Sequence, residues 1–320
     1  MHKTIKTVQL CEINVSDRVF VVTDGRGIAA LQSAIVSCDL LQPPCLWRAR
    51  AEEPYKIVCG YLRMLALQNL GRQQLRAWVF DPETAQASLL ECALQENLSH
   101  RTFNQVEIAN ALQRLLALFP RDVVLSEWLP RFGLSASGRM LERFLGLCSL
   151  EEEPRMALVA GTLTEASAVR LCSYSSDDRL AIFALMQQLH LSAGKQAELL
   201  ESLEDLARRD VVALCDVVSS DDIVRVCSDV SLNRVQKTDR VRHILRTRRF
   251  PRLQAAELRF ASALKELNIP SGIRIMPPPG FEGRKFKAEI TFASAEELHR
   301  SSRELLLADR MQVFKRLCAE

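Results

Sequence analysis

The sequence lacks several features that would assign it to whole classes of protein. No uninterrupted apolar run among its 320 residues approaches the roughly 18 that indicate a membrane-spanning helix, so we expect no membrane association. The first residues, MHKTIKTVQLCEI, contain no long apolar core of the kind that secretory signals have. With 48% hydrophobic and 25% charged residues and a net charge of only +3, the composition is that of an ordinary globular protein, which we expect in the cytoplasm.

The usual signatures of metal sites, disulfides and catalytic sets are also missing. Ten cysteines are present, but none forms a C-x-x-C pair and none has a histidine at metal-ligand spacing. We therefore expect scattered cysteines that act as small buried side chains in a reducing compartment. The five histidines are isolated and no carboxylate cluster accompanies Glu96, so no convincing catalytic set is found.

The most informative stretch is 40–112, where short apolar runs alternate with helical spacing. Gly60 begins a predicted helix over 61–69 and Gly71 ends it. Three apolar runs bounded by proline or glycine are predicted to be buried strands: 45–47, 55–58 and 76–80.

Three motifs of this stretch are found together in one family. Leu41-Gln42-Pro43 precedes the first strand, residues 55–66 carry a Y-x-I-V-x-G box, and Glu96-Asn97 is followed by Asn104 and Glu107. In order and spacing these motifs resemble those of the ParB family of plasmid and chromosome partition proteins. The resemblance implies an N-terminal domain that binds CTP with Mg²⁺, and closure of a dimer into a clamp around DNA.

By this resemblance, Gly60, Arg63, Glu96 and Asn97 bind the nucleotide, and Glu96 and Asn97 also bind the metal. A glycine-led helix start offers free N–H groups to phosphate, and an arginine adds charge-assisted hydrogen bonds. Mg²⁺ uses only one or two protein carboxylates beside phosphate oxygens. Alternatively, these acidic and amide residues simply end one helix, while Asn104 and the glutamate three residues later cap the next.

The sequence departs from the family pattern at three positions. Tyr61 stands where the family has glutamate, Leu62 where it has its first arginine, and His100 where the second box has arginine. Arg101 is adjacent to that last position, and the sequence leaves open whether it substitutes for the missing arginine. The departures leave open whether CTP is bound, whether it is weakly hydrolysed, or whether nucleotide switching has been lost.

Before the motifs, we predict strands over 7–13 and 18–22 and a helix over 28–37. Gly25 and Gly27 lie between the second strand and this helix and imitate a dinucleotide fingerprint. Because no clean βαβ unit follows, the pattern favours a tight turn.

After the motifs, a helix over 122–132, a glycine turn and a helix over 135–147 follow the helix-turn-helix plan. A recognition helix inserts its first residues into the major groove, where arginine can pair with guanine. A helical hairpin with a solvated arginine face is the alternative. The predicted DNA-contacting residues are Ser135, which we expect to cap the second helix, Ser137, Arg139 and Arg143.

Charge changes sign further along the chain. Residues 201–230 are rich in acids, whereas 234–252 hold eight lysines and arginines against Asp239 alone. A basic block of this kind is typical of a phosphate-contacting surface or a solvated linker. We expect Arg246, Arg248 and Arg249 to contact the DNA backbone.

The C-terminal residues are predicted to form a helix over 253–267, strands over 272–276 and 285–292, and a helix capped by Ser294 with Glu297. This order resembles the family's dimerisation module. A unit on the order of 60 residues buries little surface alone, which favours a dimer.

We therefore predict an α+β chain in four parts. They are a small mixed α/β ParB-like domain (1–103), an all-helical helix-turn-helix domain (104–210), a charged helical region (211–252) and a ββα-type dimerisation domain (253–320). The expected function is sequence-specific binding of double-stranded DNA by a homodimer in plasmid or chromosome partition. Its expected partner is a ParA-type ATPase, and its expected place is the nucleoid or a plasmid. The alternatives are a regulator of a plasmid, phage or genomic island without nucleotide switching, and a nuclease.

Overall fold

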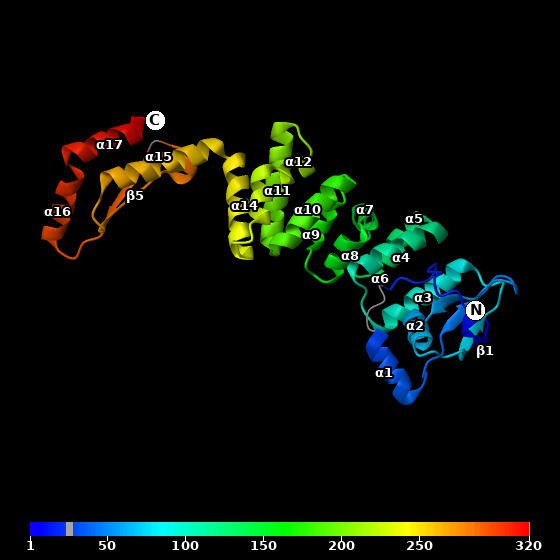
Figure 1. The fold of residues 1–320 in the computed structure, drawn as a ribbon. Helices are drawn as coiled ribbons and strands as arrows, with labels where there is room; N and C mark the ends of the chain where they lie inside the picture. The colour runs from blue at the N-terminus through cyan, green and yellow to red at the C-terminus, as the bar shows by residue number, and fades with distance from the viewer. Residues whose placement is uncertain (24–27, 284, 320) are drawn as a thin grey trace. The chain divides into compact units, whose positions relative to one another are not determined.

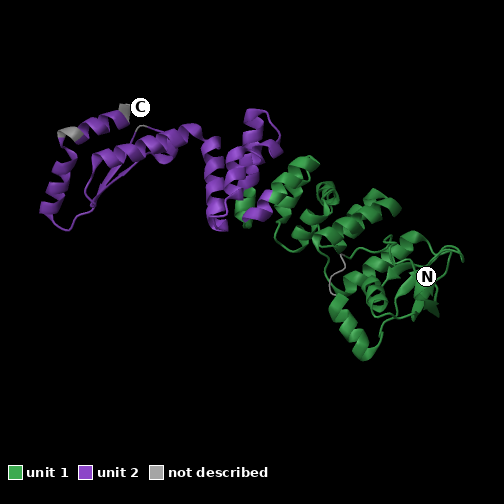
Figure 2. Ribbon diagram, in the orientation of Figure 1, with its two compact units in different colours: residues 1–184, 190–197 green, residues 185–189, 198–320 purple. Residues whose placement is uncertain are grey.

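The computed structural model describes residues 1–23, 28–283 and 285–319, so the glycine pattern at Gly25 and Gly27 lies outside the described residues. The chain divides into two compact units, residues 1–184 with 190–197 and residues 185–189 with 198–320 (Figure 2). In the described part, no helix is long and apolar enough to cross a membrane. The four predicted domain borders remain predictions.

The first unit begins with a four-stranded sheet in the order β1-β4-β2-β3. Its strands are β1 (Lys3–Gln9), β2 (Cys45–Trp47), β3 (Lys56–Cys59) and β4 (Gln74–Phe80). β4 pairs antiparallel with β1 and parallel with β2, and β2 pairs antiparallel with β3. The three strands predicted after residue 40 are thus confirmed, because each is a short apolar run between turn residues.

The strand predicted over 18–22 is wrong. Asn14 Oδ1 accepts the backbone N–H of Ser16 at 3.0 Å and of Asp17 at 3.2 Å, which turns the chain before a strand can form. Val21 and Val22 are still buried, so the apolar run reflects packing in a loop. β1 also ends earlier than predicted, at Gln9, where a 3-10 turn begins.

Three helices accompany the sheet in Figure 1: α1 (Ile28–Cys38), α2 (Tyr61–Asn69) and α3 (Gln86–His100). α1 packs against α2, and α3 packs against β3. Leu46 of β2, Ile57 of β3 and Met64 of α2 are completely or almost completely buried in one apolar core. The predicted helix over 61–69 is confirmed, since glycines in the left-handed region stand at both of its ends.

The rest of the first unit is helical. Its helices include α4 (Gln105–Leu118), α5 (Arg121–Val123), a π turn (Val124–Trp128), α6 (Leu129–Arg131), α7 (Gly138–Leu147), α8 (Glu152–Val159) and α9 (Glu165–Leu171). α10 (Ser176–Leu189) and α11 (Ala193–Asp210) follow, and the residues of both helices are divided between the two units. The segment predicted as one helix over 122–132 is therefore helical with a π turn inside it.

The second helix of the predicted helix-turn-helix begins later than expected. Ser137, not Ser135, is the N-cap of α7, because its Oγ accepts the backbone N–H of Met140 at 3.2 Å. Gly133 makes the preceding turn with φ +75°, as predicted.

The second unit contains α12 (Leu214–Val218), α13 (Asp221–Ser228), α14 (Arg234–Arg249) and α15 (Pro251–Leu267), then a hairpin of β5 (Ile273–Met276) and β6 (Lys287–Ile290), then α16 (Ala295–Leu305) and α17 (Ala308–Ala319). The predicted helix, two strands and Ser294-capped helix are present, and Ser294 accepts the N–H of Glu297 at 3.2 Å. α17 was not predicted. The middle and C-terminal functions assigned from the sequence remain predictions.

Candidate functional site

Arg63 brings together the three motifs that the sequence places far apart. It lies in the first turn of α2, and its side chain is 15% exposed. Its Nη1 donates to the carbonyl oxygen of Gln42 at 2.9 Å, and its Nη2 donates to Glu96 Oε1 on α3 at 2.8 Å. The proline-containing entry, the glycine box and the glutamate box therefore meet at one guanidinium group.

Gly60 makes this close approach sterically feasible. Its φ is +85°, in the region that glycine adopts without strain, and a Cβ there would lie 2.9 Å from Arg63 Nε. The first hydrogen bond of α2 runs from the N–H of Met64 to the carbonyl of Gly60, at 3.0 Å. The N–H groups of 61–63 precede this bond, so they are the groups that a helix start offers to an anion.

The start of α2 is better suited to binding a phosphate group than to binding a metal ion that protein side chains alone would hold. Helix N–H groups and a guanidinium both favour phosphate oxygens, although Glu96 balances the charge of Arg63. Among the described residues, no group of three or more His, Cys, Asp or Glu could hold a metal ion. A Mg²⁺ here would depend on Glu96 together with phosphate oxygens.

Asn97, the second predicted ligand, directly follows Glu96 but is engaged with residues one helical turn before and after it. Its Nδ2 donates to the carbonyl of Ala93 at 2.8 Å, and its Oδ1 accepts from Arg101 at 3.4 Å. The structure therefore brings Gly60, Arg63 and Glu96 together and gives Asn97 other partners.

Arg101, which is adjacent to the position of the missing arginine, is held at the start of α4. Its Nη1 donates to Glu107 Oε2 at 2.7 Å, and Glu107 is only 2% exposed. Asn104 caps α4 because its side-chain oxygen accepts the N–H of Glu107 at 2.9 Å, and the carboxylate of Glu107 accepts the N–H of Asn104 at 3.1 Å. The reading of Asn104 and Glu107 as a capping box is thus confirmed.

Tyr61, which stands in place of a glutamate, forms part of a contact that sequence reasoning missed. Its hydroxyl accepts from Arg18 Nη2 at 2.7 Å, and the guanidinium lies 4.8 Å from the centre of its ring. Arg18 therefore brings a cation to the first residue of α2. Leu62, where the family has its first arginine, instead packs against the apolar core.

No sequence signal identified Arg18, because it was assigned to a strand. The role of Gln42 was also missed, since its backbone carbonyl, which any residue could supply, receives Arg63.

The predicted recognition helix presents one arginine to solvent and holds the other. Arg139, in the first turn of α7, is exposed, as is Ser135 in the preceding turn. Arg143 Nη2 lies 2.8 Å from Glu165 Oε1 at the start of α9. Of the two arginines, Arg139 is therefore the better placed to meet an external group.

The three arginines predicted to contact the DNA backbone are paired with carboxylates of the second unit. Arg246 lies 2.7 Å from Glu257, Arg248 pairs with Asp222, and Arg249 lies 2.6 Å from both Glu201 and Asp205. The acidic and basic segments of the sequence thus balance each other, and the DNA-contacting role of the three arginines stays a prediction.

Comparisons with known proteins agree with the motifs. Residues 1–98 match the model of the ParB N-terminal domain. The nucleoid occlusion protein of Oceanobacillus iheyensis is 29% identical over 153 residues, which is 48% of this chain and 51% of that protein. The chain thus spans about half the length of the curated relatives it matches.

Solved structures are also similar at low sequence identity. One is the C-terminally truncated chromosome-partitioning protein ParB from Caulobacter crescentus complexed with CTP-gamma-S. It is 21% identical with a TM-score of 0.25, covering 54% of this chain and 93% of that one. The same protein complexed to the centromeric parS site is 18% identical with a TM-score of 0.34, covering 60% of this chain and 96% of that one.

Proposed function

We propose that the chain is a sequence-specific DNA-binding partition protein of the ParB family whose N-terminal domain binds CTP, since residues 1–98 match the model of the ParB N-terminal domain. The single observation that carries the proposal is the convergence of three motifs at Arg63, which contacts Gln42 and Glu96 beside the start of α2. A fold that only needed an apolar core would not bury most of a guanidinium at this point.

In the proposed site, the phosphates of the nucleotide lie against the first N–H groups of α2. Gly60 leaves room for them, and Arg63 supplies the charge-assisted hydrogen bonds. Arg18 takes over the cationic role that Leu62 has lost, because its guanidinium already lies on Tyr61. Glu96 positions Arg63 and would be the carboxylate that holds Mg²⁺ together with phosphate oxygens of the nucleotide.

DNA binding is assigned to the segment from Gly133 to the end of α7. Arg139 is exposed at the start of that helix, where recognition helices read base edges. Ser135 and Ser137 lie beside it and are suited to phosphate contacts. The match to the ParB N-terminal domain and the similarity to a nucleoid occlusion protein motivate the partition role and its place on the nucleoid or a plasmid.

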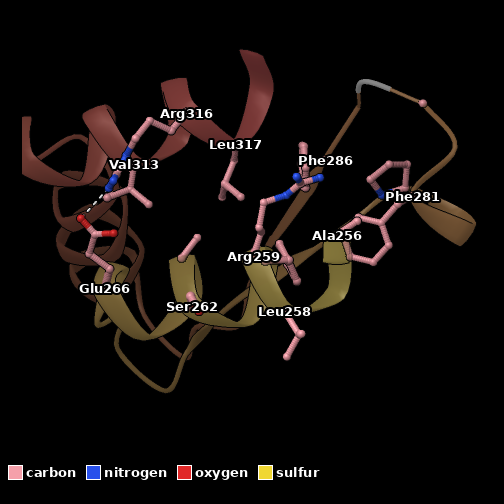
Figure 3. Close-up of a pocket in the computed structure, with 14 residues that line it drawn as sticks. Ala256, Leu258, Arg259, Ser262, Glu266, Phe281, Phe286, Val313, Arg316 and Leu317 are labelled. Atoms are coloured by element: carbon pink, nitrogen blue, oxygen red, sulfur yellow. Dashed lines mark hydrogen bonds and ion pairs between the residues drawn. The ribbon is translucent and has the colours of Figure 1, made fainter. Parts of the chain in front are cut away.

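A homodimer and a ParA-type ATPase partner complete the proposal. The module from α15 to α17 has a small buried core of Phe260, Ile273 and Ile275. Beside it lies a pocket of about 470 Å³, with Val313 and Leu317 of α17 among its lining residues (Figure 3). A second copy would cover apolar surface that one module leaves exposed. Light scattering should give twice the mass of one chain, and a monomer at all concentrations contradicts the dimer.

The central experiment is calorimetric titration of the full chain with Mg²⁺ and each of CTP, ATP, GTP and UTP. We expect binding of CTP alone, lost in Arg63→Ala. Arg72→Ala is the matched control, because Arg72 follows the same helix but is 53% exposed and lies 3.6 Å from Asp39. Equal binding by both variants would contradict the assignment of Arg63.

One observation favours a second function, a DNA-binding regulator without nucleotide switching. Arg101 is held by the buried Glu107 and so does not replace the arginine missing at His100. If none of the four nucleotides binds while DNA still binds in a salt-sensitive manner, the regulator is the better description. Cleavage of the DNA would instead favour a nuclease.

A further inference from the structure

Three of the ten cysteines lie together beside the Arg63 site. Cys45 of β2 stands opposite Cys59 of β3 in the antiparallel register. Cys92 lies on α3, which packs against β3. The side chain of Cys59 is hydrogen-bonded to those of both Cys45 and Cys92. The expectation that the cysteines are scattered is therefore wrong for this group, although Cys45 and Cys59 are buried as expected. The expected burial is wrong for Cys11 and Cys38, which are exposed.

The three thiols differ in their tendency to ionise. The hydrogen bond from Cys59, together with the nearby Lys3, lowers the pKa of Cys92 to about 7, against the effects of burial and of two acidic neighbours. The pKa of Cys59 is raised, because its hydrogen bonds to Cys45 and Cys92 and its burial all favour the neutral thiol. The single S–H of Cys59 can be donated to one neighbour at a time. Cys92 is half-buried and Cys45 is buried, so water can also solvate a thiolate on Cys92.

This arrangement suits reversible thiol oxidation better than metal binding. Among the described residues, no group of three or more His, Cys, Asp or Glu could hold a metal ion, and this holds for these cysteines too. A redox-sensitive pair needs a thiolate that is partly accessible and a second thiol in contact with it. Cys92 and Cys59 meet both conditions, whereas the exposed Cys11 and Cys38 have no thiol partner among the described residues.

We propose that Cys92 and Cys59 form a peroxide-sensitive thiol pair that is converted to a disulfide. The Cys92 thiolate attacks one oxygen of a hydroperoxide, the O–O bond breaks, and Cys92 becomes a sulfenic acid while alkoxide or hydroxide leaves. The sulfur of Cys59 then attacks that of Cys92, and the hydroxyl group leaves with the Cys59 proton as water. The two sulfurs together lose two electrons, and the peroxide gains them.

The disulfide would act on the nucleotide site, a consequence that rests on the proposed function. Cys59 directly precedes Gly60, and Cys92 lies one helical turn before Glu96. A disulfide imposes a fixed separation on its two Cβ atoms. Because Gly60 and Arg63 are already in close contact, a shift of the chain at Cys59 displaces the start of α2. We expect the oxidised protein to lose nucleotide affinity.

The test oxidises the full chain with hydrogen peroxide, blocks the remaining thiols with iodoacetamide and maps the cross-linked peptides by mass spectrometry. We expect a Cys59–Cys92 disulfide that a thiol reductant reverses. Cys45→Ser should leave it intact and Cys92→Ser should abolish it, with Cys38→Ser as the exposed control. If a variant fails to fold, the disulfide mapped in the oxidised parent protein is sufficient to test the proposal.

The outcomes separate the two proposals. A cross-link between Cys45 and Cys59 alone, or sulfenic acid formation at Cys38 and Cys11 before Cys92, overturns the thiol pair. Equal CTP binding by reduced and oxidised protein overturns its effect on the nucleotide site. Absence of nucleotide binding in the reduced protein defeats the proposed function, whereas the mapped disulfide still establishes the redox site.

Discussion

Arg101 donates to Glu107 at 2.7 Å, and this carboxylate is almost completely buried at the start of α4. Glu107 also accepts the N–H of Asn104 at 3.1 Å, so one carboxylate ends the loop after α3 and begins the next helix. Arg101, which the sequence suggests as a nucleotide contact, therefore forms a structural contact with Glu107 instead. Its guanidinium also lies 4.8 Å from the centre of the Phe103 ring.

We predict that Glu107→Gln destabilises the protein by about 1–3 kcal/mol, because the amide keeps the shape but removes the charge that balances Arg101. Urea unfolding measures the change. The matched control is Glu127→Gln, which removes an exposed i, i+4 pair with Arg131 at 3.7 Å and should cost less than about 0.5 kcal/mol. An equal loss of unfolding free energy in the two variants would show that the buried pair stabilises the protein no more than the exposed pair does.

A second prediction concerns Arg18. Its guanidinium lies on Tyr61 at the start of α2, where we expect it to attract a phosphate. Arg18→Ala should weaken CTP binding by about 1–3 kcal/mol, the range of a charge-assisted hydrogen bond. Calorimetry measures this change. Arg76→Ala on β4 removes an exposed arginine of the same domain and should leave the affinity unchanged.

Tyr61→Phe separates the two contributions of that contact. The variant keeps the ring beneath Arg18 and removes only the hydroxyl that accepts its hydrogen bond. Its affinity should lie between those of the parent and Arg18→Ala. If Arg18→Ala binds CTP as tightly as the parent, Arg18 supports the fold through Tyr61 and does not contact the nucleotide.

The sequence predicted the elements that short-range chemistry specifies. Glycines at both ends of α2 and the Asn104–Glu107 capping box depend on residues within one helical turn, so these boundaries were correct. The loop after β1 was mistaken for a strand because Val21 and Val22 are apolar, and periodicity does not distinguish a buried loop from a strand.

The site was predicted less completely than the fold. Arg63 and Glu96 were identified from their motifs, but the contact between Arg18 and Tyr61 spans 43 positions of sequence. The three-cysteine group likewise needs the strand register and the packing of α3, neither of which spacing alone reveals. Long-range contacts of this kind depend on topology, and no local pattern records them.

A third prediction concerns acid stability. Both oxygens of Glu151 accept from Arg179, at 2.8 and 3.0 Å, and this contact lowers the pKa of Glu151 to about 2. A carboxyl whose pKa is lower in the folded state stabilises the fold above its ordinary pKa of 4.5. That stabilisation is lost as the pH falls from about 4.5 towards 2.

Glu151→Gln should therefore lower the free energy of unfolding by about 1–2 kcal/mol near neutral pH, after allowance for solvent screening. The difference from the parent should shrink as urea titrations are repeated at more acidic pH. Glu142→Gln removes an exposed ion pair with Arg121 and should show a small difference throughout. A loss that is independent of pH would mean that the carboxylate charge does not matter.

The last prediction tests the assignment of α7 to DNA recognition. Arg139 is exposed in its first turn, whereas Arg143 is held by Glu165. If Arg139 reads a base, Arg139→Ala should cost about 1–3 kcal/mol on the preferred site and relax the choice of base at one position. Selection from a random DNA library, followed by affinity measurements at fixed salt, detects both effects.

Two arginines of the same unit serve as controls for that measurement. Arg121 forms its ion pair with Glu142 on α7, so Arg121→Ala should leave the base preference unchanged. Arg143→Ala removes the partner of Glu165 and should reduce stability more than specificity, because its Nη2 is already engaged. If Arg139→Ala keeps the base preference of the parent and Arg143→Ala changes it, then Arg143 and not Arg139 is the residue that reads a base.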